Sequence, residues 1–154
     1  MKCLSYKYEI KNTFSNVRDF SFEEKKSPFL IEKNVNKFLD LIFDFKTSLR
    51  EKTLKIYNIN ERIEKLTWFD NLNDECLKLS NDLISLARDL HLSLIRQYVA
   101  INFVRNKGIA KKEIKDFKNS IDELKEVYSD LESALFFLPE MPGFKETTKE
   151  LSLV

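Results

Sequence analysis

Apolar residues recur at steps of three and four over most of the chain after residue 27, a spacing typical of amphipathic α-helices. The first such run follows Ser27 and Pro28, a hydroxyl residue that can cap a helix and a proline that suits its first turn. Its apolar positions are Ile31, Val35, Phe38, Ile42, Phe45, Leu49 and Ile56. The pattern therefore predicts a long helix that begins at Pro28.

The end of this helix is open to two interpretations. Asn58 and Asn60, with Glu61 close behind, resemble a side-chain cap, which favours a break and a short second helix reaching Trp68 and Phe69. The alternative is one continuous helix up to residue 69. We favour the break.

Two further long helices are predicted after the polar turn at residues 70–74. The apolar positions of the first are Cys76, Leu79, Leu83, Leu86, Leu90, Leu94, Tyr98 and Ile101. Gly108 is the expected C-terminal stop of this helix. The last helix starts near Ala110 and ends at Pro139. Because the connection between them is so short, these two helices are expected to lie antiparallel.

The two ends of the chain show less helical periodicity. Leu4, Tyr6, Tyr8 and Ile10 alternate with polar residues, the two-residue rhythm of a half-buried strand. A single strand has no sheet to join, so residues 1–26 are predicted to be an extended arm that packs on the body or on another subunit, or else a frayed terminus. Residues 139–154 are expected to form a tail.

These elements indicate an all-α fold, an antiparallel up-and-down bundle of three long helices and one short helix. The helical domain would span residues 27–138. A chain of 154 residues suits one domain, and two glycines with three prolines provide too few turn residues for a sheet of many strands.

The overall charge excludes little. Lys and Arg number 26 against 25 Asp and Glu, so nothing draws the whole molecule to nucleic acid or to an anionic membrane. The longest apolar run, residues 134–138, is far too short to span a bilayer. The N-terminal residues do not resemble a secretory signal, so we expect a cytoplasmic protein whose Cys3 and Cys76 stay reduced.

Several kinds of chemistry lack the residues they need. One histidine and two distant cysteines cannot build the familiar zinc or di-iron sites. Neither glycine belongs to a phosphate-binding loop, so the fingerprints of nucleotide and dinucleotide sites are missing. We therefore expect no cofactor and no metal.

Polar residues interrupt the apolar face of the third predicted helix. At 100° per residue His91 and Asn102 fall inside that face, and Arg88 and Arg105 flank it. The helix is apolar over most of its circumference between residues 90 and 104, so we predict that it is the central element. Possible partners for its buried polar groups are Asp40, Asp44 and Glu113. The first interpretation is a set of satisfied core residues that fix helix register.

The alternative interpretation of the same residues is a polar cleft. Arg88, Asn102 and Arg105 would bind a phosphodiester, and His91 would assist attack by a ribose 2′-hydroxyl, giving RNA cleavage without a metal. Nucleic-acid binding could also use a basic stripe on the last helix. Its members are Lys111, Lys115, Lys118 and Lys125. Acidic neighbours and the lack of interleaved aromatic residues favour a solvated face instead.

Aromatic side chains exceed what a small helical core needs, at 13 Phe, five Tyr and one Trp. Large aromatic residues without an active site point to an interface. The candidates are Phe29, Phe43, Trp68, Phe69, Phe137 and Phe144. The sequence thus favours a non-enzymatic protein that acts through protein–protein contacts, with a homo-oligomer as the expected assembly. A fully intramolecular core is the alternative.

Overall fold

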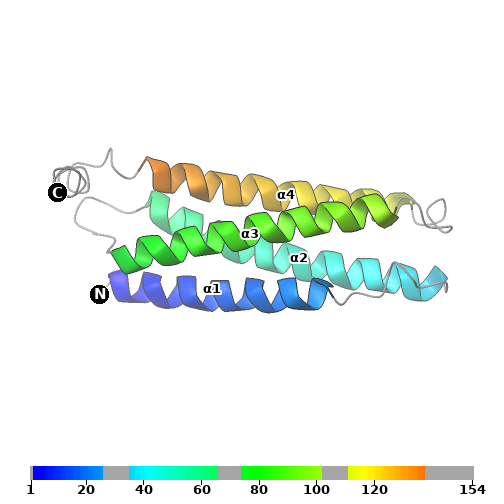
Figure 1. Cartoon of the computed structure of the whole chain (residues 1–154), viewed down its shortest axis with the longest axis horizontal. Coiled ribbons are helices and arrows are strands. Elements are labelled where there is room, and N and C mark those ends of the chain that lie inside the picture. The colour runs from blue at the N-terminus through cyan, green and yellow to red at the C-terminus, as the bar shows by residue number, and fades with distance from the viewer. Residues whose placement is uncertain (1, 26–34, 66–73, 102–110, 138–154) are drawn as a thin grey trace.

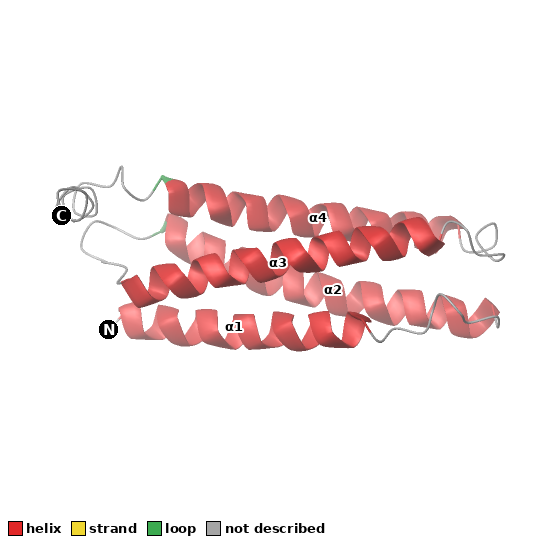
Figure 2. Cartoon of the chain, in the orientation of Figure 1, coloured by secondary structure: helices red, strands yellow, loops and turns green. Residues whose placement is uncertain are grey.

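Four long helices account for nearly all of the described chain in the computed structural model (Figure 1). They are α1 (Lys2–Lys25), α2 (Val35–Glu64), α3 (Asp74–Ile101) and α4 (Lys111–Phe136). The structure describes residues 2–25, 35–65, 74–101 and 111–137, and none of these residues forms a strand (Figure 2). The predicted all-α fold is confirmed. The predicted helix start at residues 27–28 and the stop at Gly108 lie outside the described residues.

Each helix packs against two others. α1 contacts α2 and α3, and α4 likewise contacts α2 and α3. The cross-helix bonds give the directions: Tyr6 bonds to Ser80 and Glu24 bonds to Ser93, so α1 and its neighbour α3 run the same way. In Figure 1 the chain direction, followed by colour, reverses from each helix to the next.

The core is built from residues at alternating steps of three and four, the heptad spacing of packed helices. In α3 the buried series includes Cys76, Ser80, Leu83, Ala87, Leu90, Leu94 and Ile101. In α4 it includes Ile114, Phe117, Ile121, Leu124, Tyr128 and Leu131. The α3 series shares five positions with the predicted stripe, whereas Leu79, Leu86 and Tyr98 of that stripe are only half-buried. Helices of this length bury one such stripe against their neighbours.

The prediction of an extended N-terminal arm is wrong, because Lys2–Lys25 form α1. The buried residues of α1 fall in a heptad series in which Thr13 and Glu24 hold two of the positions. The other members of the series are Tyr6, Ile10, Val17 and Phe20. Tyr8, which completed the apparent alternation, is 77% exposed on the outer side of the helix. Polar side chains in the stripe hid its helical period.

The predicted break near residue 58 is also wrong, since α2 continues to Glu64. Ile59 and Ile63 are buried and extend the stripe of α2 past the apparent cap. Burial of these side chains against the bundle outweighs the local preference of asparagine for a helix terminus. The predicted short helix is therefore the last part of a long one, and Trp68 and Phe69 lie outside the described residues.

α3 is one of four packed helices in the described chain rather than an enclosed central rod. Leu92 and Val99, on its outer side, are each 50% exposed. The apolar circumference that suggested a central position therefore faces solvent in part. None of the described helices combines the length and the low charge needed to cross a bilayer.

Candidate binding site

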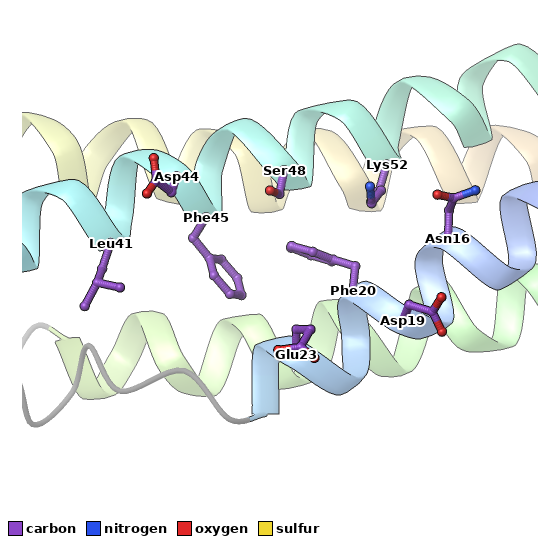
Figure 3. Close-up of a pocket in the computed structure, with 9 residues that line it drawn as sticks. All are labelled: Asn16, Asp19, Phe20, Glu23, Leu41, Asp44, Phe45, Ser48 and Lys52. Carbon is purple, nitrogen blue, oxygen red and sulfur yellow. The ribbon is translucent and has the colours of Figure 1, made fainter.

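An open groove of about 370 Å³ runs between α1 and α2 (Figure 3). Apolar side chains form its floor, and charged or amide side chains form its rim. Its lining residues are Asn16, Asp19, Phe20, Glu23, Leu41, Asp44, Phe45, Ser48 and Lys52. We call this feature the α1–α2 groove.

Two phenylalanine rings make the floor of the groove. Figure 3 shows Phe20 of α1 and Phe45 of α2 pointing toward each other, and their ring centroids lie 5.0 Å apart at a tilt of 43°. Phe45 also meets Phe117 of α4 edge to face at 6.1 Å. Phe20 is 7% exposed. The floor is thus anchored in the core, and its shape is fixed before anything binds.

The antiparallel pairing of α1 and α2 places this floor. Glu9 near the start of α1 pairs with Arg62 near the end of α2, while Phe20 meets Phe45 further along. On α2 the short side chain of Ser48 lies between Phe45 and Lys52, and Asn16 of α1 lies at the Lys52 end of the groove (Figure 3).

The rim of the groove is acidic. Asp19, Glu23 and Asp44 supply three carboxylates, and Lys52 supplies one ammonium group. Asp19 pairs with Arg18 at 3.5 Å, and Lys52 pairs with Glu51 at the same distance. Because the charges of Arg18 and Glu51 cancel, including them leaves the net charge of the rim negative. Ligands with positive charge are therefore attracted and phosphates are repelled.

Beyond its two rings and one leucine, the lining of the groove consists of charged, amide and hydroxyl side chains. It contains neither histidine nor cysteine. The groups in the lining that could act as a base toward the Ser48 hydroxyl are three carboxylates and one lysine. Nucleophilic catalysis needs a hydroxyl or thiol with a base held beside it. Within the described ranges, no cluster of His, Cys, Asp or Glu side chains is arranged to hold a metal ion.

The predicted polar site on α3 is only partly within the described residues. His91 is 8% exposed and packs edge to face on Tyr128 of α4, with ring centroids 5.9 Å apart. Arg88, one turn away, forms an ion pair with Glu132. Asn102 and Arg105 lie outside the described residues. The aromatic contact and the ion pair both tie α3 to α4.

The surroundings of His91 disfavour protonation of its imidazole. Burial lowers the pKa of His91, the Lys125 ammonium group lowers it further, and Asp122 opposes them. The charged groups that act on His91 are Lys125 and Asp122, neither of which was a predicted partner, and the predicted partner Asp44 lines the α1–α2 groove. These contacts match the structural interpretation of His91 better than the catalytic one.

A buried polar cluster at the end of α1 had no counterpart in the sequence predictions. The Glu24 side chain is fully buried, and the Ser93 hydroxyl lies 2.8 Å from both of its carboxylate oxygens. Gln97 donates to the Glu24 carbonyl at 3.0 Å. Burial raises the pKa of Glu24, against the opposing effect of the Ser93 bond. The cluster fixes the end of α1 against α3.

Two of the predicted interface aromatics are described, and both are exposed. Phe43 is 57% exposed and Phe137 is 61% exposed. Phe136, which was not predicted, is 75% exposed, and its ring meets that of Phe137 at 5.3 Å. The other candidates lie outside the described residues: Phe29, Trp68, Phe69 and Phe144.

Sequence reasoning missed the α1–α2 groove as a site. Phe45 was placed in the core stripe of its helix and Asp44 among possible core partners, but Phe20 and Glu23 fell in the supposed arm. The heptad series of α1 would have placed Phe20 in a helix, yet no local signal says which helix lies beside it.

Comparison of the chain with protein-family models, curated proteins and solved structures finds no match.

Proposed function

We propose that this protein is a non-enzymatic helical-bundle protein that acts by binding protein surfaces. The observation that carries the proposal is the α1–α2 groove, an open apolar floor with charged residues only at its rim. Recognition of an amphipathic helix by such a groove is a recurrent mode of protein binding. A floor that is already ordered lowers the entropic cost of association.

Self-association is the second part of the proposal. It is supported by large apolar side chains that stay in contact with solvent, above all Phe43 and the edge-to-face pair Phe136 and Phe137. Exposed aromatic residues of this kind anchor subunit contacts when a second surface covers them. The cytoplasmic location expected from the sequence stays a prediction.

RNA cleavage is not proposed. The reaction needs an imidazole open to the ribose hydroxyl and a guanidinium open to the phosphate. His91 is buried against Tyr128, and Arg88 is paired with Glu132. These contacts favour a structural role for both side chains.

Sedimentation velocity over a range of micromolar concentrations tests self-association. We expect the wild-type sedimentation coefficient to rise with concentration, and the Phe136→Ser/Phe137→Ser variant to remain a monomer. Leu92→Ser/Val99→Ser is the matched control, because it removes two exposed apolar side chains from α3 instead. A wild-type protein that stays monomeric at every concentration contradicts self-association.

A further inference from the structure

We propose that the α1–α2 groove docks a short amphipathic helix of a partner protein that carries lysine or arginine beside its apolar side chains. This inference rests on the proposed function and names the chemistry of the partner. Three properties of the groove carry it: its length, its aromatic floor and the sign of its rim charges.

The dimensions of the groove suit a helix of a few turns. Its lining spans Leu41 to Lys52 along α2 and Asn16 to Glu23 along α1. At 1.5 Å per residue these stretches are roughly 16 Å and 10 Å long. A partner helix of about two to three turns covers that distance and presents apolar residues at i, i+3 or i+4, and i+7.

The floor provides what such apolar residues need. Phe20 and Phe45 lie in the middle of the groove and Leu41 lies at one end, as Figure 3 shows. Branched or aromatic side chains placed over these rings lose contact with water and gain dispersion contacts with a fixed surface. Because Phe45 is also packed on Phe117, the floor does not need to reorganise.

The rim selects the charge of the partner. Asp44 lies on the α2 side toward the Leu41 end and Glu23 on the α1 side, whereas Lys52 and Asn16 lie together at the opposite end (Figure 3). Glu23 and Asp44 are both exposed, so they can turn toward a bound cation without losing a buried contact. A basic residue of the partner is attracted to this acidic end, and an acidic residue there is repelled.

Fluorescence anisotropy with labelled synthetic peptides tests the partner chemistry. The probe is a short amphipathic helix of leucine and lysine. It is compared with a leucine and glutamate helix of the same pattern, and with a scrambled leucine and lysine peptide that cannot form an apolar face. We expect the first peptide to bind more tightly than either of the others, and its affinity to fall as salt is added.

Rim variants locate the binding. Reversing two rim charges in Glu23→Lys/Asp44→Lys is expected to weaken the leucine and lysine peptide about tenfold, which corresponds to about 1.4 kcal/mol. The matched control is Glu126→Lys/Asp130→Lys, which makes the same change at exposed positions of α4 away from the groove. We expect the control to bind nearly as well as the wild type.

A floor variant separates the groove from simple charge attraction. Phe45→Leu keeps an apolar side chain in the core but removes one ring of the floor, and it is expected to weaken the amphipathic peptide more than the scrambled one. Circular dichroism melting of each variant verifies that it is folded. Equal binding of the scrambled peptide, or an equal loss in the α4 control, overturns the proposal.

The remaining outcomes distinguish this inference from the proposed function. If the leucine and glutamate peptide binds as well and Phe45→Leu weakens it, the groove docks a helix but the basic partner is wrong. If no peptide binds, the groove fails as a docking site and the proposed use of it fails too. If the wild type self-associates and the rim variant Glu23→Lys/Asp44→Lys does not, the occupant of the groove is a second copy of this chain, which overturns the inference.

Discussion

The hydroxyl pair between Tyr6 and Ser80 offers the most direct test of the way α1 joins the bundle. The two oxygens lie 3.1 Å apart, and both residues are buried. Ser80 has one proton, and it donates that proton to the Cys76 carbonyl at 2.8 Å. Because that proton is taken by the Cys76 carbonyl, we assign the Tyr6 hydroxyl as the donor to Ser80. Burial raises the pKa of Tyr6, against the opposing effect of the Ser80 bond.

Removing either partner of this bond has unequal consequences. Ser80→Ala leaves the Tyr6 hydroxyl buried with no acceptor, which costs about 1–3 kcal/mol. The higher helix propensity of alanine returns only a few tenths of that. Tyr6→Phe removes the donor but leaves the Ser80 proton bonded to Cys76, so we expect a smaller loss of about 0.5–1.5 kcal/mol.

A double-mutant cycle measured by urea unfolding distinguishes this bond from its surroundings. Once Tyr6→Phe has removed the hydroxyl, the further change Ser80→Ala is expected to cost little stability. The losses in free energy of unfolding of the two single variants should therefore sum to about 1 kcal/mol or more above the loss of the double variant. Unfolding followed by circular dichroism gives each free energy. Additive losses, or a Ser80→Ala loss smaller than the Tyr6→Phe loss, would refute the assigned direction of the bond and the docking of α1.

Three further predictions address the core and its titratable groups. Leu90 is fully buried, so Leu90→Ala should lower the free energy of unfolding by about 2–5 kcal/mol in urea, and a loss below about 1 kcal/mol would contradict its place in the core. The pKa of Glu24 is raised above its ordinary value of 4.5, so the folded state binds the carboxyl proton more strongly than the unfolded chain does. The free energy of unfolding should therefore fall as pH rises above 4.5, and the Glu24→Gln variant should lack this fall. The pKa of His91 is lowered, so wild-type stability should be complete above 6.5 and decline as pH drops below it, whereas His91→Phe should lack the decline. Parallel pH profiles of wild type and variant would disprove either titration.

The periodicity of apolar residues was enough to predict the long helices in the second half of the chain. Both segments are helical, and most positions of the stripe predicted for α3 are buried, because a long amphipathic segment has few other ways to bury its apolar side. The same method failed for α1, where Thr13 and Glu24 occupy core positions. The buried Glu24 is tolerated there because Ser93 of α3 donates to its carboxylate, and the pattern of a single helix gives no sign of that bond.

For the candidate site too, the sequence predicted some features and left others to the tertiary structure. The excess of aromatic residues led to the prediction of an interface; Phe43 and Phe137 are exposed, and their part in an interface stays a prediction. The α1–α2 groove could not be predicted, because its floor joins Phe20 to Phe45 across two helices whose adjacency is not encoded in either local pattern.

The sequence by itself determined the helical class, the long amphipathic segments and the identity of most side chains that must leave water. Only the tertiary structure decided which helices are neighbours, that α1 belongs to the bundle, and that Asn58 and Asn60 lie within a helix rather than at its end. The physical reason is that a side chain is buried only when another segment of the chain packs over it. A spacing of three and four shows which side of a helix avoids water, but contacts such as that of Tyr6 with Ser80 depend on the segment that covers it.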